Sequence, residues 1–257
     1  MEESAPDPVA GPQSPEGASR VLTAYLEVRD TYAERLSTPA RGEPLLTSLG
    51  RRVVPQPARF RARFIVTELV RPLEERRAKS VLSHDPLRLH PGCQKVRKEG
   101  WVNIDLAGFP VDLRWNLLRK LPLESGRADA VFHEHLLEHF SLRDGLWLAR
   151  EWFRVLKSGG VLRIGVPDAA SYLRSYVEDP AFLQNLRPDS PTKLLAVQEL
   201  FYWQNHRTMY DFETMRLLLT AAGFQHVEKS AYGESRIEPS PDSPHREVET
   251  LYVEAVK

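Results

Sequence analysis

One stretch of this sequence restricts the fold more than any other: residues 129–140, DAVFHEHLLEHF, together with the glycine turn that follows at 156–160. An apolar strand enters a corner rich in His and Glu, then come a helix, the turn and a second apolar strand, 161–166. Strands that alternate with helices are typical of parallel α/β sheets, which place their ligands at the carboxyl ends of the strands. The corner after residue 132 is therefore the first candidate for a functional site.

Local signals bound the helices on either side of the second strand. Ser141 is a candidate N-cap with Asp144 three residues later, and Gly159 with Gly160 should stop the helix that begins there. Asp211 is expected to cap a later helix, which should end at a glycine. These signals place the helices without reference to the rest of the chain.

Further strands are expected at 88–92, 101–106, 109–113, 224–232 and 247–256. A Pro-rich loop, 238–246, joins the last two, which indicates an antiparallel pair at the edge of the sheet. The predicted fold is α/β, a Rossmann-like, mostly parallel sheet of about seven strands with an antiparallel edge hairpin, plus an N-terminal helical arm.

The chain divides into three predicted parts. Residues 1–19 hold four prolines among acidic and small residues and are expected to be a disordered tail rather than a signal peptide. Residues 20–80 carry apolar positions at helical spacing and form the predicted helical arm or lid. Within them, Pro72 should end or kink a helix, and Phe60 and Leu69 should belong to the core. Residues 81–257 form the main domain, with a helical insertion at about 168–210 over the candidate site.

Composition excludes several classes of protein. No run of about 18 apolar residues is present, so no membrane span is expected. The single cysteine, Cys93, permits no disulfide within the chain and fits a reducing, cytoplasmic compartment. The net charge is zero, which argues against nucleic acid as a partner. Residues 51–79 are locally basic, with nine Lys and Arg against three Glu. A solvated helix face is the favoured interpretation, and a phosphate-binding patch is the alternative.

A second candidate site lies upstream. Gly92 ends a short strand, where the lack of Cβ lets the backbone approach a ligand closely, and Asp105 ends the next strand. An acid at that position can accept both ribose hydroxyls of an adenosine. The two residues are 13 positions apart, shorter than the roughly 20 of dinucleotide folds. A nicotinamide site is therefore disfavoured.

Taken in order, these segments resemble the class I S-adenosylmethionine-dependent methyltransferases. The matching stretches are 92–105, 121–123, 129–140 and 154–160, and the segment 201–212 resembles the small-molecule, type 11-like branch. Each motif is loose by itself, but their order is specific, and the resemblance covers roughly residues 88–257. It implies S-adenosyl-L-methionine as the cofactor and a small-molecule methyl acceptor as the substrate.

The resemblance also implies roles for individual residues. Gly92 at the glycine corner, the acid Asp105 and its neighbour Leu106 are expected to contact the cofactor. Asn116 and Leu117 are expected near the adenine amino group. His133 should contribute its backbone after the fourth strand, and Leu136 should lie near the sulfonium methyl. A general base helps when the acceptor must lose a proton, and histidine has a suitable pKa. His135 and His206 are the candidates.

Two departures from the family pattern keep an alternative open. Gln94 stands in place of a second glycine, and Asn116 stands in place of an aspartate. A cofactor-binding protein without turnover is therefore weighed beside the enzyme. An enzyme acting on RNA or on nucleotide-linked acceptors is the other alternative, and it depends on the basic stretch 51–79.

The segment 135–139 also matches the inverted zinc-protease pattern H-x-x-E-H. That site needs both histidines on one helix and a further distant ligand, whereas His135 falls at a strand-to-helix corner. Glu138 and His139 are therefore interpreted as structural, and no metal is assigned. The predicted function is methyl transfer to an oxygen or nitrogen of a small-molecule or sugar-type metabolite. The acceptor itself and the oligomeric state do not follow from the sequence.

Overall fold

The computed structural model describes residues 20–27, 56–108, 110–202 and 205–257. Its seven strands are β1 (Arg88–Pro91), β2 (Val102–Asp105), β3 (Leu113–Arg114), β4 (Ala128–Glu134), β5 (Leu156–Pro167), β6 (His226–Ser230) and β7 (Thr250–Val256). They form one sheet in the order β3-β2-β1-β4-β5-β7-β6. Strands β1 to β5 pair in parallel, and β7 is antiparallel to both of its neighbours. The predicted fold class is confirmed.

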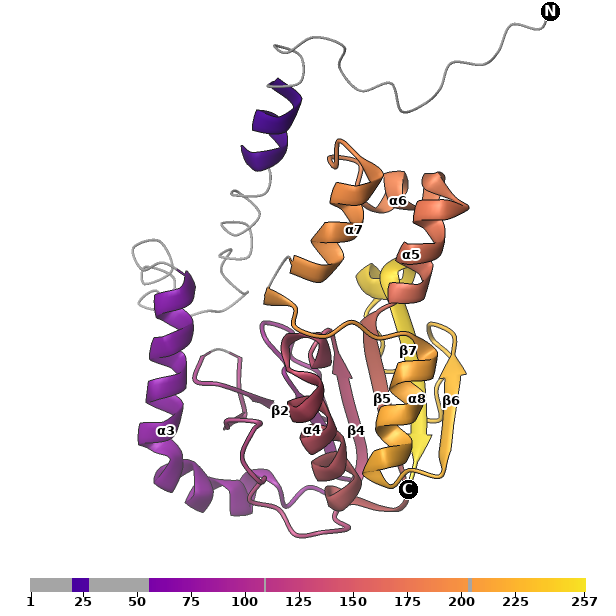
Figure 1. Ribbon diagram of the computed structural model, residues 1–257. Coiled ribbons are helices and arrows are strands. Elements are labelled where there is room, and N and C mark those ends of the chain that lie inside the picture. The colour runs from indigo at the N-terminus through magenta and orange to yellow at the C-terminus, as the bar shows by residue number, and fades with distance from the viewer. Residues whose placement is uncertain (1–19, 28–55, 109, 203–204) are drawn as a thin grey trace, which may run out of the picture.

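Helices lie on the sheet and beyond its carboxyl edge (Figure 1). They are α3 (Gln56–Val81), α4 (Leu142–Val155), α5 (Ala169–Val177), α6 (Pro180–Leu186), α7 (Lys193–Tyr202) and α8 (Phe212–Ala222), with the short 3-10 helices η1 (Leu137–His139) and η3 (Pro244–Glu249). Helices α4 and α8 pack against each other on one face of the sheet. Helices α5, α6 and α7 form a smaller cluster with its own apolar core beyond the strand ends.

The capping signals act as the sequence predicts. The Ser141 hydroxyl accepts a hydrogen bond from the Asp144 amide at the start of α4, and Asp211 caps α8 on the Thr214 amide. One expectation is wrong, because α4 ends at Val155 and Leu156 already has extended backbone, so the turn at 159–160 lies inside β5. Strand β5 follows the helix directly.

The two faces of the sheet differ in chemistry because side chains alternate along each strand. Apolar residues such as Leu89, Val131 and Leu162 belong to the main core, to which α4 contributes Leu148 and Trp152. Their neighbours in sequence face the other way and include four buried polar side chains: His90, Asn103, Arg163 and Glu254.

Loops, rather than a crossover helix, border the polar face. The connection 92–101 between β1 and β2 contains turns only, as its short length predicts. On the other side, the segment 231–246 lies across the face, since Arg163 donates to the Ala231 carbonyl and to both carboxylate oxygens of Asp242. The polar face is thus buried by its own ion pairs and by this segment.

The N-terminal arm departs from one expectation. Of the two effects expected of Pro72, an end of the helix does not occur, because α3 continues through Pro72 to Val81. Its large apolar side chains are exposed among the described residues, with Leu69 at 74% and Phe60 at 60%, and do not join the core. Polar side chains of α3 face the sheet instead, through Thr67 and others described below.

Some predictions lie outside these observations. The tail 1–19 lies outside the described residues, and the division into arm and main domain stays a prediction. The stretch 168–210 holds α5, α6 and α7, although its role over an acceptor also stays a prediction. In the described part of the chain, no helix has the length and apolar character needed to cross a membrane.

Candidate active site

A pocket lies at the point where the strand order reverses, between the carboxyl ends of β1 and β4. Open α/β sheets bind ligands in this crevice. The pocket holds about 340 Å³ of empty space, part of which is open to solvent. Its walls come from β1 and the turn after it, from the end of β4 and from η3: His90, Gly92, Cys93, Gln94, Val96, Glu134, Ser243, His245 and Arg246.

The glycine corner packs tightly against the β4 side of the crevice. Gly92 has φ +70°, a left-handed conformation that glycine adopts readily. A Cβ on Gly92 would lie 2.5 Å from Leu136 Cδ1, so the backbone touches that side chain directly. The structure therefore brings together two of the predicted cofactor residues.

Asp105 lies beside the same corner. Its Oδ2 accepts a hydrogen bond of 2.8 Å from the Gln94 amide, and its Oδ1 accepts one of 2.6 Å from the Leu106 amide. Asp105 does not itself line the pocket but touches Gln94, which does. The predicted glycine and acid thus face one region at neighbouring strand tips, and the ribose role of Asp105 stays a prediction.

An arginine that sequence reasoning missed also holds this region. Arg63, on α3, donates from Nη2 to Asp105 Oδ1 at 3.2 Å and from Nε to the Ala107 carbonyl at 2.5 Å. The residue lies in the locally basic stretch, where nothing in the sequence distinguishes it from its basic neighbours. Only the docking of α3 beside β2 shows which arginine reaches the acid.

On the β3 side, Asn116 contacts α3 as well. Its Nδ2 donates to Glu68 Oε1 at 2.9 Å, and its Oδ1 accepts from the Leu118 amide. Hydrogen bonds from Arg119 and Asn116 hold the pKa of Glu68 below its ordinary value. An aspartate at 116 would face the Glu68 carboxylate, which gives a physical reason for the amide here. Leu117 is buried in the core.

His133 is placed with its side chain away from the pocket. The ring lies on the apolar face, 6.3 Å from the Trp152 ring, and neither ring nitrogen has a hydrogen-bond partner among the residues that the structure describes. Burial lowers the pKa of His133 to about 3, so the ring is neutral. Any part in cofactor binding therefore belongs to its backbone, as the resemblance implied.

His135 is buried at the end of β4 with both ring nitrogens engaged. Its Nδ1 lies 3.2 Å from Arg246 Nη1 and its Nε2 lies 2.9 Å from Thr250 Oγ1. A guanidinium only donates, so Nδ1 is the acceptor and Nε2 carries the proton that is donated to Thr250. Burial lowers the pKa of His135 to about 3, which keeps the ring neutral. In this arrangement no lone pair is left for a substrate proton.

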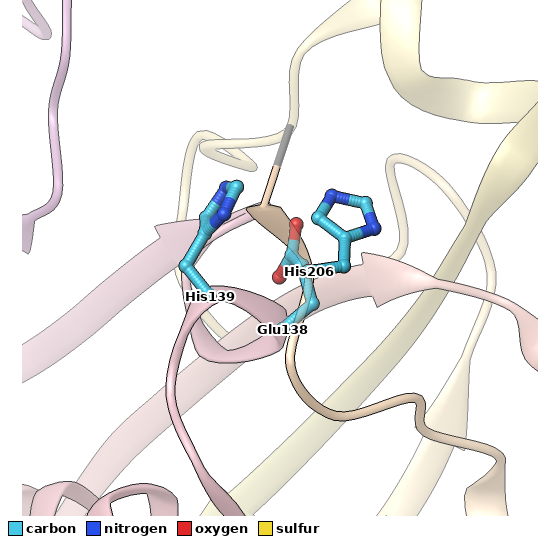
Figure 2. Close-up of side chains that lie close together, drawn as sticks. All are labelled: Glu138, His139 and His206. Atoms are coloured by element: carbon cyan, nitrogen blue, oxygen red, sulfur yellow. The ribbon is translucent and has the colours of Figure 1, made fainter. Parts of the chain in front are cut away.

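His206 has the complementary arrangement. Its Nδ1 lies 2.7 Å from the Leu200 carbonyl, which can only accept, so Nδ1 carries the proton and Nε2 carries the lone pair. Burial lowers the pKa of His206 below its ordinary value. The ring lies 5.0 Å from the His139 ring in an edge contact, and the Glu138 carboxylate lies close to both (Figure 2). Burial raises the pKa of Glu138 to about 8.

The pocket walls include residues that the sequence did not single out. Ser243, His245 and Arg246 come from a segment interpreted only as a Pro-rich connection. The Ser243 amide donates to Glu134 Oε1 at 3.0 Å, which fixes the segment over the end of β4. A histidine and an arginine in a Pro-rich loop are a weak signal, because their position over β4 depends on contacts more than 100 residues apart in sequence.

Comparison with known proteins agrees with this geometry. Residues 92–164 match the family model described as a methyltransferase domain. That match begins at the glycine corner and ends inside β5, so it includes the β2 and β4 ends of the site. Together with the sheet described above, it supports a class I S-adenosylmethionine-dependent methyltransferase domain in this part of the chain. S-adenosyl-L-methionine is accordingly its cofactor.

Solved structures that resemble the chain are distant. One is a methyltransferase dependent on S-adenosylmethionine from Archaeoglobus fulgidus, with 15% identity, 76% of this chain and 94% of that chain covered, and a TM-score of 0.42. Another, from Thermotoga maritima, is described as a possible histamine N-methyltransferase, with 17% identity, 78% and 95% covered, and a TM-score of 0.39. No curated protein matches the chain. Similarity at this level does not identify a substrate.

The residues at the strand tips fit this cofactor. The Gly92 corner exposes backbone where a side chain would not fit beside Leu136, and the pocket at the switch point adjoins it. A carboxylate at the β2 tip suits vicinal ribose hydroxyls, which would compete with the partly exposed Arg63 for Oδ1 of Asp105. The Gln94 side chain does not prevent the corner from forming, because Gln94 adopts φ +48° and its amide bonds to Asp105.

Proposed function

We propose that this methyltransferase transfers the methyl group to an oxygen or nitrogen of a small molecule, such as a sugar-type metabolite. The observation that carries this proposal is the burial of the polar groups at the end of β4. His135 and Glu138 are buried, and His206 is half-buried, so the groups best placed to meet an acceptor lie below the surface. A small acceptor reaches such groups more easily than a folded macromolecule does.

In this proposal the cofactor is held by the glycine corner, the Asp105 carboxylate and the backbone after β4. S-adenosylmethionine supplies an electrophilic methyl group, so the protein's main task is to hold the acceptor atom in line with it. Leu136 touches Gly92 and directly follows His135 in the chain, so it lies where the cofactor and acceptor would meet in this proposal. Enclosure by buried side chains also keeps water out of the region.

His206 is the proposed proton acceptor, because its Nε2 carries the lone pair and its ring is neutral. A proton leaves the acceptor hydroxyl or amine for this nitrogen, while the Leu200 carbonyl holds the Nδ1 proton. His135 has a positioning role in this scheme, since it links Arg246 of the pocket wall to Thr250 of β7.

The contacts of the basic stretch 51–79 weaken the argument for RNA as the alternative acceptor. Part of the basic stretch is paired within the fold: Arg71 lies within 4 Å of Glu68 and Glu75, and Arg77 approaches Glu74. These contacts neutralise charge that a phosphate backbone would need.

Calorimetric titration with S-adenosylmethionine tests the cofactor part of the proposal. Asp105→Ala should weaken binding by about 10- to 100-fold, because charge-assisted hydrogen bonds to the ribose are lost. Asp105→Asn keeps one acceptor oxygen, so its affinity should lie between those of the wild type and Asp105→Ala. Glu124→Ala, which removes an exposed carboxylate, serves as the control. Unchanged affinity in a folded Asp105→Ala protein would contradict the assignment.

Release of S-adenosylhomocysteine in a screen of small hydroxyl and amine compounds tests the acceptor. A compound that supports turnover should lose most of its rate with His206→Ala but keep its cofactor affinity. Turnover on RNA alone, with none on small molecules, would overturn the proposal.

A further inference from the structure

Three side chains with ligand atoms meet beside the end of β4. They are Glu138 and His139 of η1 and His206, which precedes α8 in the chain, and their ligand atoms all lie within 4.8 Å of one another. Figure 2 shows the Glu138 carboxylate beside the two imidazole rings. The set combines one carboxylate with two imidazoles, which divalent transition metals such as Zn²⁺ prefer.

Among the described residues, no hydrogen-bond donor compensates the Glu138 carboxylate. Its side chain is 1% exposed, and neither oxygen has a hydrogen-bond partner in this part of the chain. The ring nitrogen His135 Nδ1 lies 3.5 Å from Oε1 and already accepts from Arg246. A buried carboxylate without a partner is strongly unfavourable in its charged form, and a bound cation removes that cost.

His206 has the arrangement expected of a metal ligand. Histidines that bind metals usually donate their second ring N–H to a backbone carbonyl or a carboxylate, which fixes the tautomer. The contact from Nδ1 to the Leu200 carbonyl does this, and it leaves Nε2 for the ion.

Backbone hydrogen bonds hold the two parts of the cluster together. The amides of Arg207 and Thr208 both donate to the Glu138 carbonyl, at 2.7 and 3.2 Å. The segment that carries His206 is therefore fixed against η1, although the two are separated by more than 60 residues in sequence. The ligand set does not depend on side-chain packing alone.

We propose that Glu138, His139 and His206 bind one divalent transition-metal ion, and that Zn²⁺ is a suitable probe of the site. His135 is excluded from the ligand set because both of its ring nitrogens are engaged. Three protein ligands leave a fourth position for an oxygen or nitrogen of another molecule. In that detail the inference rests on the proposed function, since the methyl acceptor would take this position.

The inference also changes the role of His206. A nitrogen that binds the ion cannot accept the substrate proton at the same time, so His206 is then a ligand. Coordination would itself make an acceptor hydroxyl more acidic, as it does for metal-bound water.

Metal binding to the full chain, after treatment with chelator, tests the site without any activity measurement. Titration with Zn²⁺ should show one ion per chain, and Co²⁺ should give the visible spectrum of a tetrahedral or five-coordinate site. Glu138→Gln and His206→Ala should each weaken binding by more than about 100-fold, because they remove ligands and not merely their supporting contacts. His226→Ala, which removes an exposed histidine, should leave the affinity unchanged.

The outcomes separate this inference from the proposed function. Wild-type affinity in Glu138→Gln, or no stoichiometric ion in the wild-type chain, overturns the metal site, while turnover by the chelated protein leaves the methyltransferase proposal standing. Stoichiometric metal bound through these ligands supports the site, even where no small molecule is methylated.

Discussion

Gln94 shows how one residue can tolerate a backbone that favours glycine. Its φ of +48° lies in the left-handed region, which costs roughly 1–2 kcal/mol for a residue with a Cβ. The hydrogen bond from its amide to Asp105 Oδ2 offsets part of that cost. The departure from the family's glycine is therefore accommodated at the corner, and the same contact joins the corner to the predicted ribose acid.

Gly92, two residues earlier, should tolerate no such replacement. Gly92→Ala adds a methyl group 2.5 Å from Leu136 Cδ1 at a φ of +70°, and Gly100→Ala adds one at φ +76° with nothing within 4 Å. Both variants carry the cost of a Cβ at positive φ. Gly92→Ala should in addition lower the free energy of unfolding by about 1–3 kcal/mol, because its methyl group overpacks the site. Urea denaturation measures this difference, and cofactor affinity should fall only for Gly92→Ala. Equal losses for the two variants would show that Leu136 yields without cost.

At the scale of elements, α3 explains why one sequence prediction failed. The apolar stripe suggested that Phe60 and Leu69 face the core, but polar residues of α3 face the sheet. The loop after β2 and the edge strand β3 present backbone groups that need partners. Thr67 accepts from the Ala107 amide, and Glu74 accepts from the amide and guanidinium of Arg114. Hydrophobic periodicity carries no information about such contacts.

Thr67→Val should test this docking. The hydroxyl is buried, and its removal leaves the Ala107 amide without its partner, so the free energy of unfolding should fall by about 1–3 kcal/mol. Thr67→Ser keeps the oxygen and should lose much less. Chemical denaturation gives the energies, and hydrogen exchange at Ala107 should accelerate in the Val variant alone. A Val variant as stable as the Ser variant would mean that this contact does not hold α3.

Features encoded locally were predictable from the sequence. The caps at Ser141 and Asp211, the alternation of strands and helices and the antiparallel edge follow from residues a few positions apart. The glycine corner and its acid were also predicted, because each ends an expected strand of a mostly parallel sheet. Arg63 and Arg246 could not be, since each reaches the site from more than 40 residues away.

At the scale of the whole molecule, the polar face is held by an ion pair that is buried completely. Arg163 is 0% exposed and Asp242 is 1% exposed, and Arg163 also lies over the Tyr252 ring at 4.7 Å. Asp242 further accepts from the Gly233 amide, so one carboxylate fixes both ends of the segment 231–246. Three residues that line the pocket, Ser243, His245 and Arg246, belong to this segment and follow its anchor Asp242. The Arg163–Asp242 ion pair therefore supports the site as well as the fold.

Asp242→Asn should therefore be costly. It leaves the buried Arg163 guanidinium without its bidentate partner, and breaking such a pair typically costs about 3–5 kcal/mol. Glu228→Gln breaks an exposed pair with Arg236 and should cost less than about 1 kcal/mol. Thermal unfolding compares the two variants. Similar melting temperatures would indicate that Glu254, 3.6 Å from Arg163, already neutralises the guanidinium.

Two stretches of the pocket wall are about 150 residues apart in the chain, the turn at Gly92 and the segment Ser243–Arg246 at the start of η3. Neither stretch forms the cavity alone, and strands β2 to β6 lie between them in the sequence. The pocket is therefore complete only when both stretches are in their folded positions. A molecule that binds there contacts both stretches, so it binds the folded chain and not the unfolded one. Its binding therefore stabilises the folded chain, and its apparent affinity reports the fraction of the protein that is folded.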